Sequence, residues 1–366
     1  MRLKKGPPDF ILFITTLALL GIGLVMVFSS SAVTAGVKYG DAYFFFKRQL
    51  LWAVIGLIAM IVIMKINYLR LREFSLPLMA VAVICLILVI TPLGIATKGS
   101  TRWLGVGILS FTPSELAKLA VVMFLAKTLE VNIDNIKSFK KGIFPYLALL
   151  AFVCGLIMAQ PDLGTSFAIA GTVFCMLLVA GAKWSHLGVI AISGLGAVAA
   201  AIAVAPYRME RFIAFLNPWK FASDEGFQTI QSLYALGSGG LFGMGLGRSR
   251  QKFFYLPEQH TDFIFAILGE ELGFLGACLV IALFLLFAWR GFRIAINAPD
   301  NFGSLLAAGV TIMVIFQAAI NIGVVSGTLP VTGITLPFIS YGGSSLLFTM
   351  AGVGLLLNIS RYSAYK

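Results

Sequence analysis

The stretch from residue 247 to 274 (GRSRQKFFYLPEQHTDFIFAILGEELGF) gathers side chains whose types and spacing could do chemistry. It opens with three cations, Arg248, Arg250 and Lys252, continues through aromatic residues, and reaches Asp262 where an apolar run begins. A carboxylate can accept a proton, and cations close to it can bind an anion. Placed at a membrane edge, this set is what chemistry on an anionic, lipid-linked substrate needs.

Other charged side chains stand at the ends of apolar runs. Arg102 and Trp103 lie between two runs, Asp162 joins two more, and Arg208 and Arg211 follow another. The segment 334–345 (ITLPFISYGGSS) enters the last run. Asp162 also fits a helix N-cap, and loop cations are usually solvated. Because these cations recur beside aromatic residues at the membrane edge, the pattern favours an anionic partner.

Two ionisable residues stand inside an apolar run. Glu115 and Lys118 are three residues apart, so they share a helix face and can form an ion pair. Thr112, Pro113 and Glu115 fit a capping box with proline at the first helical position. Charged groups in membrane spans are costly and are usually paired or functional. For Lys118, a structural ion pair and a functional role both stay open.

Further polar residues lie in later runs. Glu270 and Glu271 must point to different faces of a helix, so one could meet Lys118 and the other a cavity. Gln317 and Asn321 are four residues apart, and we expect them to form structural hydrogen bonds between helices.

Composition sets the class of protein. The 366 residues are 59% hydrophobic and 11% charged, with a net charge of +12. Soluble chains are about 45–50% apolar and about 25% charged, so this is an all-α, polytopic membrane protein. The cations stand mostly in short loops, which indicates a topology signal and no nucleic-acid partner. The four cysteines lie inside apolar runs without metal-ligand spacing, so neither a disulfide nor a metal site is predicted: Cys85, Cys154, Cys175 and Cys278.

The apolar runs must position these side chains. About ten runs approach the roughly 18 residues needed to span a bilayer as a helix. We predict spans near residues 10–30, 48–65, 76–93, 113–130, 143–160, 164–181, 186–205, 262–289, 302–326 and 338–359. The chain is then one transmembrane domain, 1–366, with a large loop at 206–261 between the seventh and eighth spans.

Charge asymmetry predicts the orientation. With the N-terminus inside, the inner segments hold 15 Lys and Arg residues and the short outer loops hold 5. The positive-inside rule therefore places both termini in the cytoplasm and loop 206–261 outside. Within that loop, residues 226–236 have the apolar spacing of a helix lying in the membrane interface. The glycines that follow either pack closely against helices or offer N–H groups to a phosphate, and both interpretations stay open.

Six motifs in order resemble the SEDS (shape, elongation, division and sporulation) family over nearly the whole chain. They are TRWLG at 101–105, FTPSELAKLA at 111–120, QPDLGT at 160–165, APYRMERF at 205–212, GLGRSRQKFFYLPEQHTDFIFAILGEELG at 245–273 and ITLPFISYGGSSLL at 334–347. The chain is most similar to the FtsW and SpoVE branch. The resemblance implies a ten-helix glycosyltransferase of the bacterial cytoplasmic membrane that polymerises lipid II into peptidoglycan. It also implies a class B penicillin-binding protein as partner.

The resemblance assigns roles to particular residues. It implies that Asp262 is the family's essential aspartate and that Arg102 and Trp103 are its arginine–tryptophan pair. Glu115 and Lys118 match the intramembrane pair, and Asp162 matches the acid of the PDLGT motif. The sequence shows no departure at these positions.

Lipid II presents a sugar on a diphosphate with a polyprenyl tail, so polymerisation needs a base, an anion site and a lipid-facing groove. We expect Asp262 to be the general base. The cations that compete for the leaving diphosphate are Arg102, Arg208, Arg211, Arg248, Arg250 and Lys252. No cofactor is implied. A lone outer aspartate does not define a metal site, and whether a divalent cation takes part stays open.

Two other functions fit the same sequence. Polar residues inside spans also suit a flippase that moves lipid II across the membrane, although no transporter-type inverted repeat is apparent. A scaffold that only positions the crosslinking partner is the third alternative.

Overall fold

The computed structural model describes residues 6–97, 100–105 and 110–363, and almost all of this chain is helical. The helices are α1 (Phe10–Tyr39), α2 (Phe44–Lys65), α3 (Tyr68–Glu73), α4 (Ser75–Ile90), α5 (Pro113–Val131), α6 (Phe144–Met158), α7 (Leu163–Val179), α8 (Trp184–Val204), α9 (Pro206–Leu216), α10 (Phe227–Ser238), α11 (Ile264–Ile296), α12 (Asn301–Val325) and α13 (Gly343–Ser360). Short 3-10 turns η2 (Ile133–Asn135) and η4 (Pro218–Phe221) and a π-turn η3 (Phe139–Ile143) join some of them. The chain is therefore an all-α, multi-pass membrane protein, as predicted.

Every predicted span overlaps a helix. Seven helical segments in the described residues are long and apolar enough to cross a membrane: α1, α2, η3 with α6, α8, α11, α12 and α13. Helices α4 and α7 are apolar but shorter, and α5 contains four charged residues. The count of ten spans stays a prediction.

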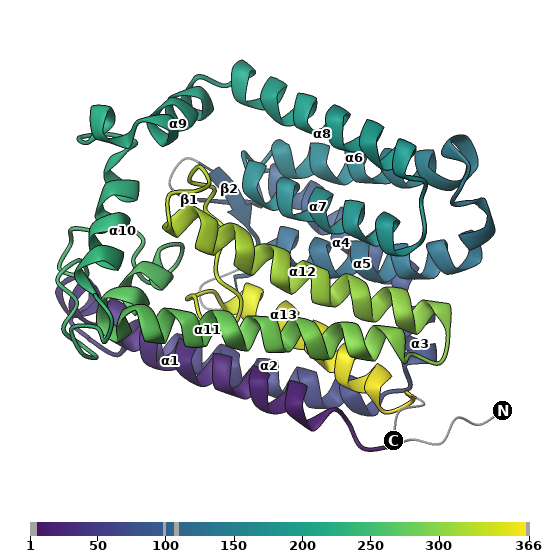
Figure 1. Cartoon of the computed structure of the whole chain (residues 1–366), viewed down its shortest axis with the longest axis horizontal. Helices are drawn as coiled ribbons and strands as arrows, with labels where there is room; N and C mark the ends of the chain where they lie inside the picture. Colours follow the sequence, from purple (N-terminus) through teal and green to yellow (C-terminus); the bar gives the residue numbers. More distant parts are fainter. Residues whose placement is uncertain (1–5, 98–99, 106–109, 364–366) are drawn as a thin grey trace.

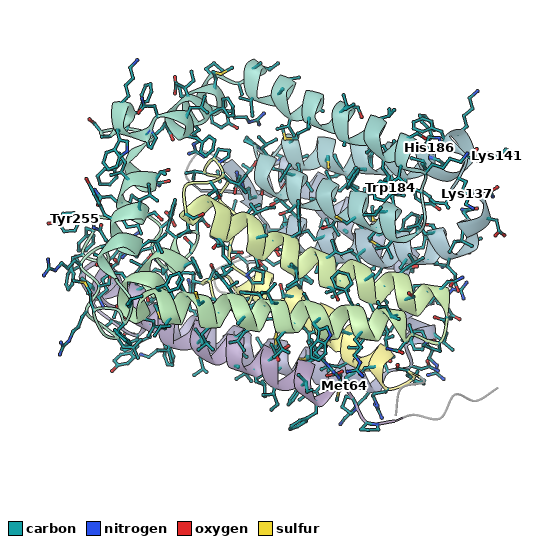
Figure 2. All side chains as sticks on the ribbon, in the orientation of Figure 1. Met64, Lys137, Lys141, Trp184, His186 and Tyr255 are labelled. Carbon is teal, nitrogen blue, oxygen red and sulfur yellow. The ribbon has the colours of Figure 1, made fainter. Side chains whose placement is uncertain are left out.

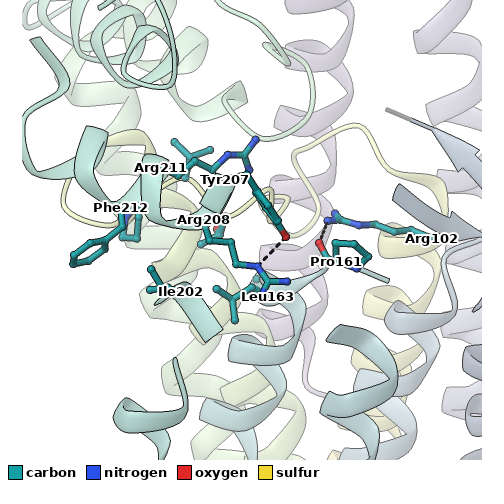
Figure 3. A pocket seen from close by; sticks show the side chains of 12 residues that line it. Arg102, Pro161, Leu163, Ile202, Tyr207, Arg208, Arg211 and Phe212 are labelled. Atoms are coloured by element: carbon teal, nitrogen blue, oxygen red, sulfur yellow. Dashed lines mark hydrogen bonds between the residues drawn. The ribbon is translucent and has the colours of Figure 1, made fainter. Parts of the chain in front are cut away.

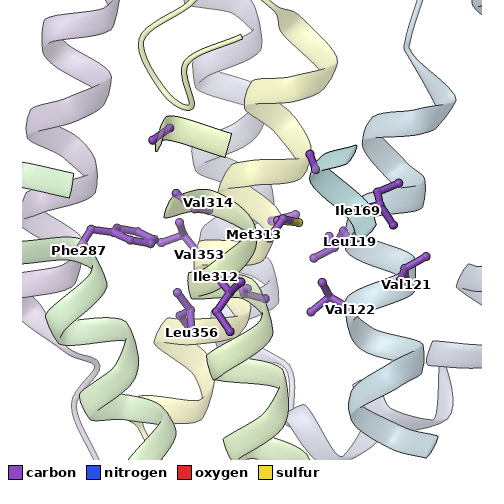
Figure 4. Close-up of a cluster of buried hydrophobic side chains, with 14 of the residues drawn as sticks. Leu119, Val121, Val122, Ile169, Phe287, Ile312, Met313, Val314, Val353 and Leu356 are labelled. Atoms are coloured by element: carbon purple, nitrogen blue, oxygen red, sulfur yellow. The ribbon is translucent and has the colours of Figure 1, made fainter. Parts of the chain in front are cut away.

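Helix α12 forms the centre of the bundle. It packs against α5, α7, α11 and α13 (Figure 1). Apolar side chains from all five helices meet there, including Leu119, Ile169, Phe287, Met313 and Val353 (Figure 4). Burial of this apolar surface fixes which face of each helix turns inward, and thereby places the polar residues on those faces.

The two ends of the bundle differ. Helix α1 begins where α13 ends, and the backbone N–H of Asp9 donates to Ser360 Oγ (3.0 Å). Lys137 and Lys141 lie at this same end, whereas Tyr255 lies at the other (Figure 2). Helix α10 also lies at that other end and runs across the axes of the long helices (Figure 1). This confirms the predicted helix at 226–236, which packs against α11 and α12.

The structure corrects the predicted elements in two places. Residues Ile95–Thr97 and Ser100–Trp103 form a two-stranded antiparallel sheet, β1 and β2, where no strand was expected. The predicted span 262–289 corresponds to α11, but that helix begins at Ile264 and has an unpredicted break at Gly273 (φ 69°, ψ −170°). The chain before α11 docks into this break, since Phe274 N donates to Gly240 O (2.8 Å) and Met244 N donates to Glu270 O (3.0 Å).

Candidate active site

Asp262 lies half-buried in the turn that precedes α11. The carbonyl oxygens of three consecutive residues each accept a hydrogen bond from outside the turn: His260 O from Tyr341 N (2.8 Å), Thr261 O from Ser340 Oγ (2.5 Å) and Asp262 O from Asn321 Nδ2 (2.7 Å). These donors belong to α12 and to the segment 334–342 before α13. The turn that carries Asp262 is therefore fixed by two elements distant in sequence.

The carboxylate of Asp262 faces the connection between α12 and α13, which also contains the segment 334–342. A Cβ added at Gly333 would lie 3.7 Å from Asp262 Oδ2. The residues immediately before Gly333, from Pro330 to Thr332, line an open pocket. Asp262 therefore lies beside the segment that borders this pocket.

The pocket brings together three of the predicted cations. Its lining includes Arg102, Leu163, Tyr207, Arg208, Arg211 and Thr332 (Figure 3). Arg102 comes from β2, whereas Arg208 and Arg211 lie one turn apart on α9, which begins at Pro206. Three guanidinium groups around an open space can bind an anion such as a diphosphate.

Arg102 is held by the connection between α6 and α7. Its guanidinium donates to Pro161 O (2.5 Å) and Gln160 O (3.4 Å) and lies 3.7 Å from Asp162 Oδ2. Asp162 caps α7 as predicted, since its side chain accepts from Thr165 N (3.0 Å). Trp103 follows Arg102 on β2 and is 44% exposed. Alternation along the strand turns it to the opposite face.

The two α9 arginines differ in their partners. Arg211 pairs with Glu225 (3.1 Å). Arg208 donates to the Tyr207 hydroxyl (2.8 Å) (Figure 3) and to Ala201 O (3.0 Å). It forms no ion pair within the part of the chain that the structure describes. Its charge is the least compensated of the three, which favours it as an anion ligand. Tyr207 was not singled out from the sequence, although its place beside Arg208 at a helix start was visible there.

The other three predicted cations do not form one cluster. Arg248 and Arg250 are exposed. Lys252 is 4% exposed and forms a salt bridge with Glu271 (3.0 Å). The expectation that Lys252 joins an outward-facing basic set is therefore wrong, because the buried carboxylate of Glu271 draws its ammonium group inward.

The two buried acids of α11 shape the loop before it. Glu270 accepts from Arg250 N (2.9 Å) and from the Ser249 hydroxyl, while Glu271 accepts from Ser29 Oγ and Lys252 Nζ. Within the described residues Lys118 pairs with Glu115 and Gln317, so neither glutamate is its partner, as one of them could have been. Carboxylates that accept several hydrogen bonds can hold a loop of this kind in one conformation.

Two glycines of this loop pack directly against α11. A Cβ at Gly239 would lie 2.1 Å from Gly269 O, and one at Gly243 would lie 2.2 Å from Glu271 O. Of the two interpretations left open for the glycine-rich segment, the structure supports close backbone packing at these positions.

The ion pair predicted between Glu115 and Lys118 is present. Lys118 Nζ lies 2.8 Å from Glu115 Oε2 and donates to Gln317 Oε1 (2.5 Å). Pro113 begins α5 as expected, but the capping box is wrong, because the Thr112 hydroxyl makes no capping bond and contacts Ser344 Oγ instead (3.2 Å). Lys118 is 6% exposed, so it supports the site from within the bundle and does not line the pocket.

Gln317 bonds to another helix as expected, through Lys118 of α5, whereas Asn321 bonds to backbone outside the helices. Gln317 also donates to Thr335 O (2.9 Å), and Asn321 also donates to Ile334 O (2.7 Å). Within the described residues, no three His, Cys, Asp or Glu side chains come together as a metal site.

Comparisons with known proteins agree with this architecture. The family model FtsW/RodA/SpoVE, described as "Cell cycle protein", matches residues 10–365. The chain is 53% identical to stage V sporulation protein E of Bacillus subtilis (strain 168) over 366 residues, which is all of both chains. It is 43% identical to a probable peptidoglycan glycosyltransferase FtsW of Geobacter sp. (strain M18), with 98% of each chain covered.

Solved structures show the same fold. One, from work titled "Structural coordination of polymerization and crosslinking by a peptidoglycan synthase complex", superposes with a TM-score of 0.79 at 32% identity and covers 97% of this chain and 98% of that one. The rod shape determining protein RodA of Thermus thermophilus superposes with a TM-score of 0.72 at 30% identity, with 98% of each chain covered. The chain belongs to the FtsW/RodA/SpoVE family of cell cycle proteins.

Proposed function

We propose that this protein is a peptidoglycan glycosyltransferase that polymerises lipid II at the outer face of the cytoplasmic membrane, with Asp262 as general base. The observation that carries the proposal is the position of Asp262, beside the segment that borders a pocket with three arginines. The names of its relatives, which include probable peptidoglycan glycosyltransferases, support the same reaction class.

The reaction assigns one task to each group. Asp262 takes the proton of a sugar hydroxyl, and the resulting oxygen attacks the anomeric carbon of a second lipid-linked sugar. The bond from that carbon to the phosphate oxygen breaks, and the lipid diphosphate leaves with the bonding electrons. Arg102, Arg208 and Arg211 stabilise the charge that develops on the diphosphate. A single displacement of this kind inverts the anomeric centre.

The reaction requires a particular orientation. The end of the bundle that carries α10 and Asp262 faces outward, and both termini are cytoplasmic. The charge asymmetry of the loops supports this orientation. A class B penicillin-binding protein is the partner we propose, since a similar structure comes from a complex that couples polymerisation with crosslinking.

The decisive experiment compares the parent and Asp262→Asn in liposomes with lipid II and the partner. The amide keeps the shape of the side chain but cannot take the proton, and loss of a general base typically lowers the rate about 100- to 10,000-fold. Normal membrane insertion and partner binding of the variant are the controls. Glycan synthesis above a few per cent of the parent rate would show that Asp262 is not the base.

The same liposomes distinguish the two alternative functions. A flippase would exchange lipid II between leaflets without making glycan strands, even as the parent protein. A scaffold would do neither and would still bind the partner. New glycan strands made by the parent and lost in Asp262→Asn support the polymerase alone.

A further inference from the structure

Asn321 holds the backbone of the proposed base. The Asn321 side chain is 1% exposed within α12, and its Nδ2 donates to both Asp262 O and Ile334 O, each at 2.7 Å. An α-helix starting at Asp262 would direct Ala266 N toward Asp262 O, but Ala266 N donates to Phe263 O instead (3.0 Å). The carbonyl of Asp262 is thus available to the asparagine, which joins it to the segment that borders the pocket.

A second amide on the same face of α12 supports this contact. Gln317 lies four residues before Asn321, one helical turn away, and donates to Thr335 O (2.9 Å). Its Oε1 accepts from Lys118 Nζ, which is itself paired with Glu115. The buried ion pair of α5 therefore fixes Gln317, and the two amides together hold residues 334 and 335 against Asp262.

We infer that Asn321 is a positioning residue, which sets the place of the Asp262 carboxylate relative to the arginine pocket. The inference rests on the proposed function. Asn321 contacts the backbone of Asp262 and not its carboxylate, so it affects the position of the base. Rates of proton transfer and nucleophilic attack depend steeply on such placement, and a shift of about 1 Å can lower a rate about 100-fold.

Asn358 provides a matched control at the opposite end of the bundle. It is 0% exposed in α13, and its Nδ2 also donates to two backbone carbonyls, those of Ile63 (2.6 Å) and Ile66. In both asparagines the Oδ1 atom is buried and has no partner among the residues that the structure describes. Removing either amide therefore removes the same number and kind of contacts.

The test measures kcat and KM for polymerisation of lipid II by the parent, Asn321→Ala, Asn321→Asp and Asn358→Ala, together with their unfolding temperatures. We expect the two alanine variants to lose similar thermal stability. We expect kcat to fall about 10- to 100-fold only in the Asn321 variants, with KM close to the parent value. Asn321→Asp keeps the shape and removes the donor, so it should be no more active than Asn321→Ala.

Several results would overturn the inference. Parental kcat in Asn321→Asp, equal losses of kcat in Asn321→Ala and Asn358→Ala, or a rise in KM alone would each assign Asn321 a structural role. If Asn321→Ala does not accumulate, Asn321→Gln retains the amide and moves it by one methylene, and it should show reduced kcat at parental KM. An active Asp262→Asn protein would overturn both the role of Asp262 as base and the positioning role of Asn321. An inactive Asp262→Asn protein together with unaffected Asn321 variants would overturn the positioning role alone.

Discussion

Arg102 joins two roles in one side chain. It contacts the carbonyls that precede α7, and it lines the pocket assigned to the lipid diphosphate. We expect Arg102→Ala to weaken lipid II binding roughly 10- to 100-fold, because a hydrogen bond to a charged group contributes about 1.5–3 kcal/mol. Arg102→Lys should recover only part of the affinity, since lysine lacks the planar fork. Binding of lipid II to the purified variants measures both effects.

Lys47 is the control for that measurement. It is an exposed cation outside the pocket, and its hydrogen bond to Asp41 (2.9 Å) lowers the pKa of that carboxyl. Lys47→Ala removes the same charge and should leave lipid II affinity unchanged. Unaltered binding in Arg102→Ala, or an equal loss in Lys47→Ala, would mean that Arg102 does not bind the diphosphate and is only solvated or structural.

Among the helices, α11 depends on the break at Gly273. Its φ of 69° is unfavourable for other residues, and an added Cβ would lie 2.2 Å from Gly243 N. We expect Gly273→Ala to destabilise the protein by about 1–3 kcal/mol through backbone strain. The clash adds to this and displaces residues 240–245 from the break. Thermal unfolding of the purified protein measures the loss.

Gly155 on α6 is the matched position for this comparison. A Cβ there would contact nothing within 4 Å, so Gly155→Ala should be neutral or stabilise the helix by up to about 1 kcal/mol. Equal unfolding temperatures for the two variants would mean that the break in α11 carries no structural role.

For the whole molecule, the orientation in the membrane decides whether Asp262 can reach lipid II outside the cell. Ser223 and Ser138 are both exposed, Ser223 just before α10 and Ser138 just before η3. In a variant without its four cysteines, Ser223→Cys should react with an impermeant thiol reagent on intact cells. Ser138→Cys should react only after permeabilisation. The reverse pattern would place Asp262 on the cytoplasmic side and contradict the proposed reaction.

Much of the site could be predicted because some of its contacts are local in sequence. The pairing of Glu115 with Lys118 follows from helical spacing, and the capping by Asp162 follows from its place before a helix. Contacts of Lys252 and Glu271 could not be predicted in the same way. Spacing shows which face of a helix a residue occupies, but the partner on that face depends on how the helices pack.

The amino-acid pattern alone indicates the class of protein, the approximate positions of the apolar helices and the motifs that mark Asp262 and its neighbours, because burial in lipid and helical periodicity act on short stretches of chain. The packed helices, in contrast, were needed to show that Arg102, Arg208 and Arg211 share one pocket while Lys252 turns inward, and that Asn321 bonds to the backbone of Asp262. These contacts join residues separated by many positions in the chain, and packing of the helices around α12 selects them from many alternatives that the same sequence pattern allows.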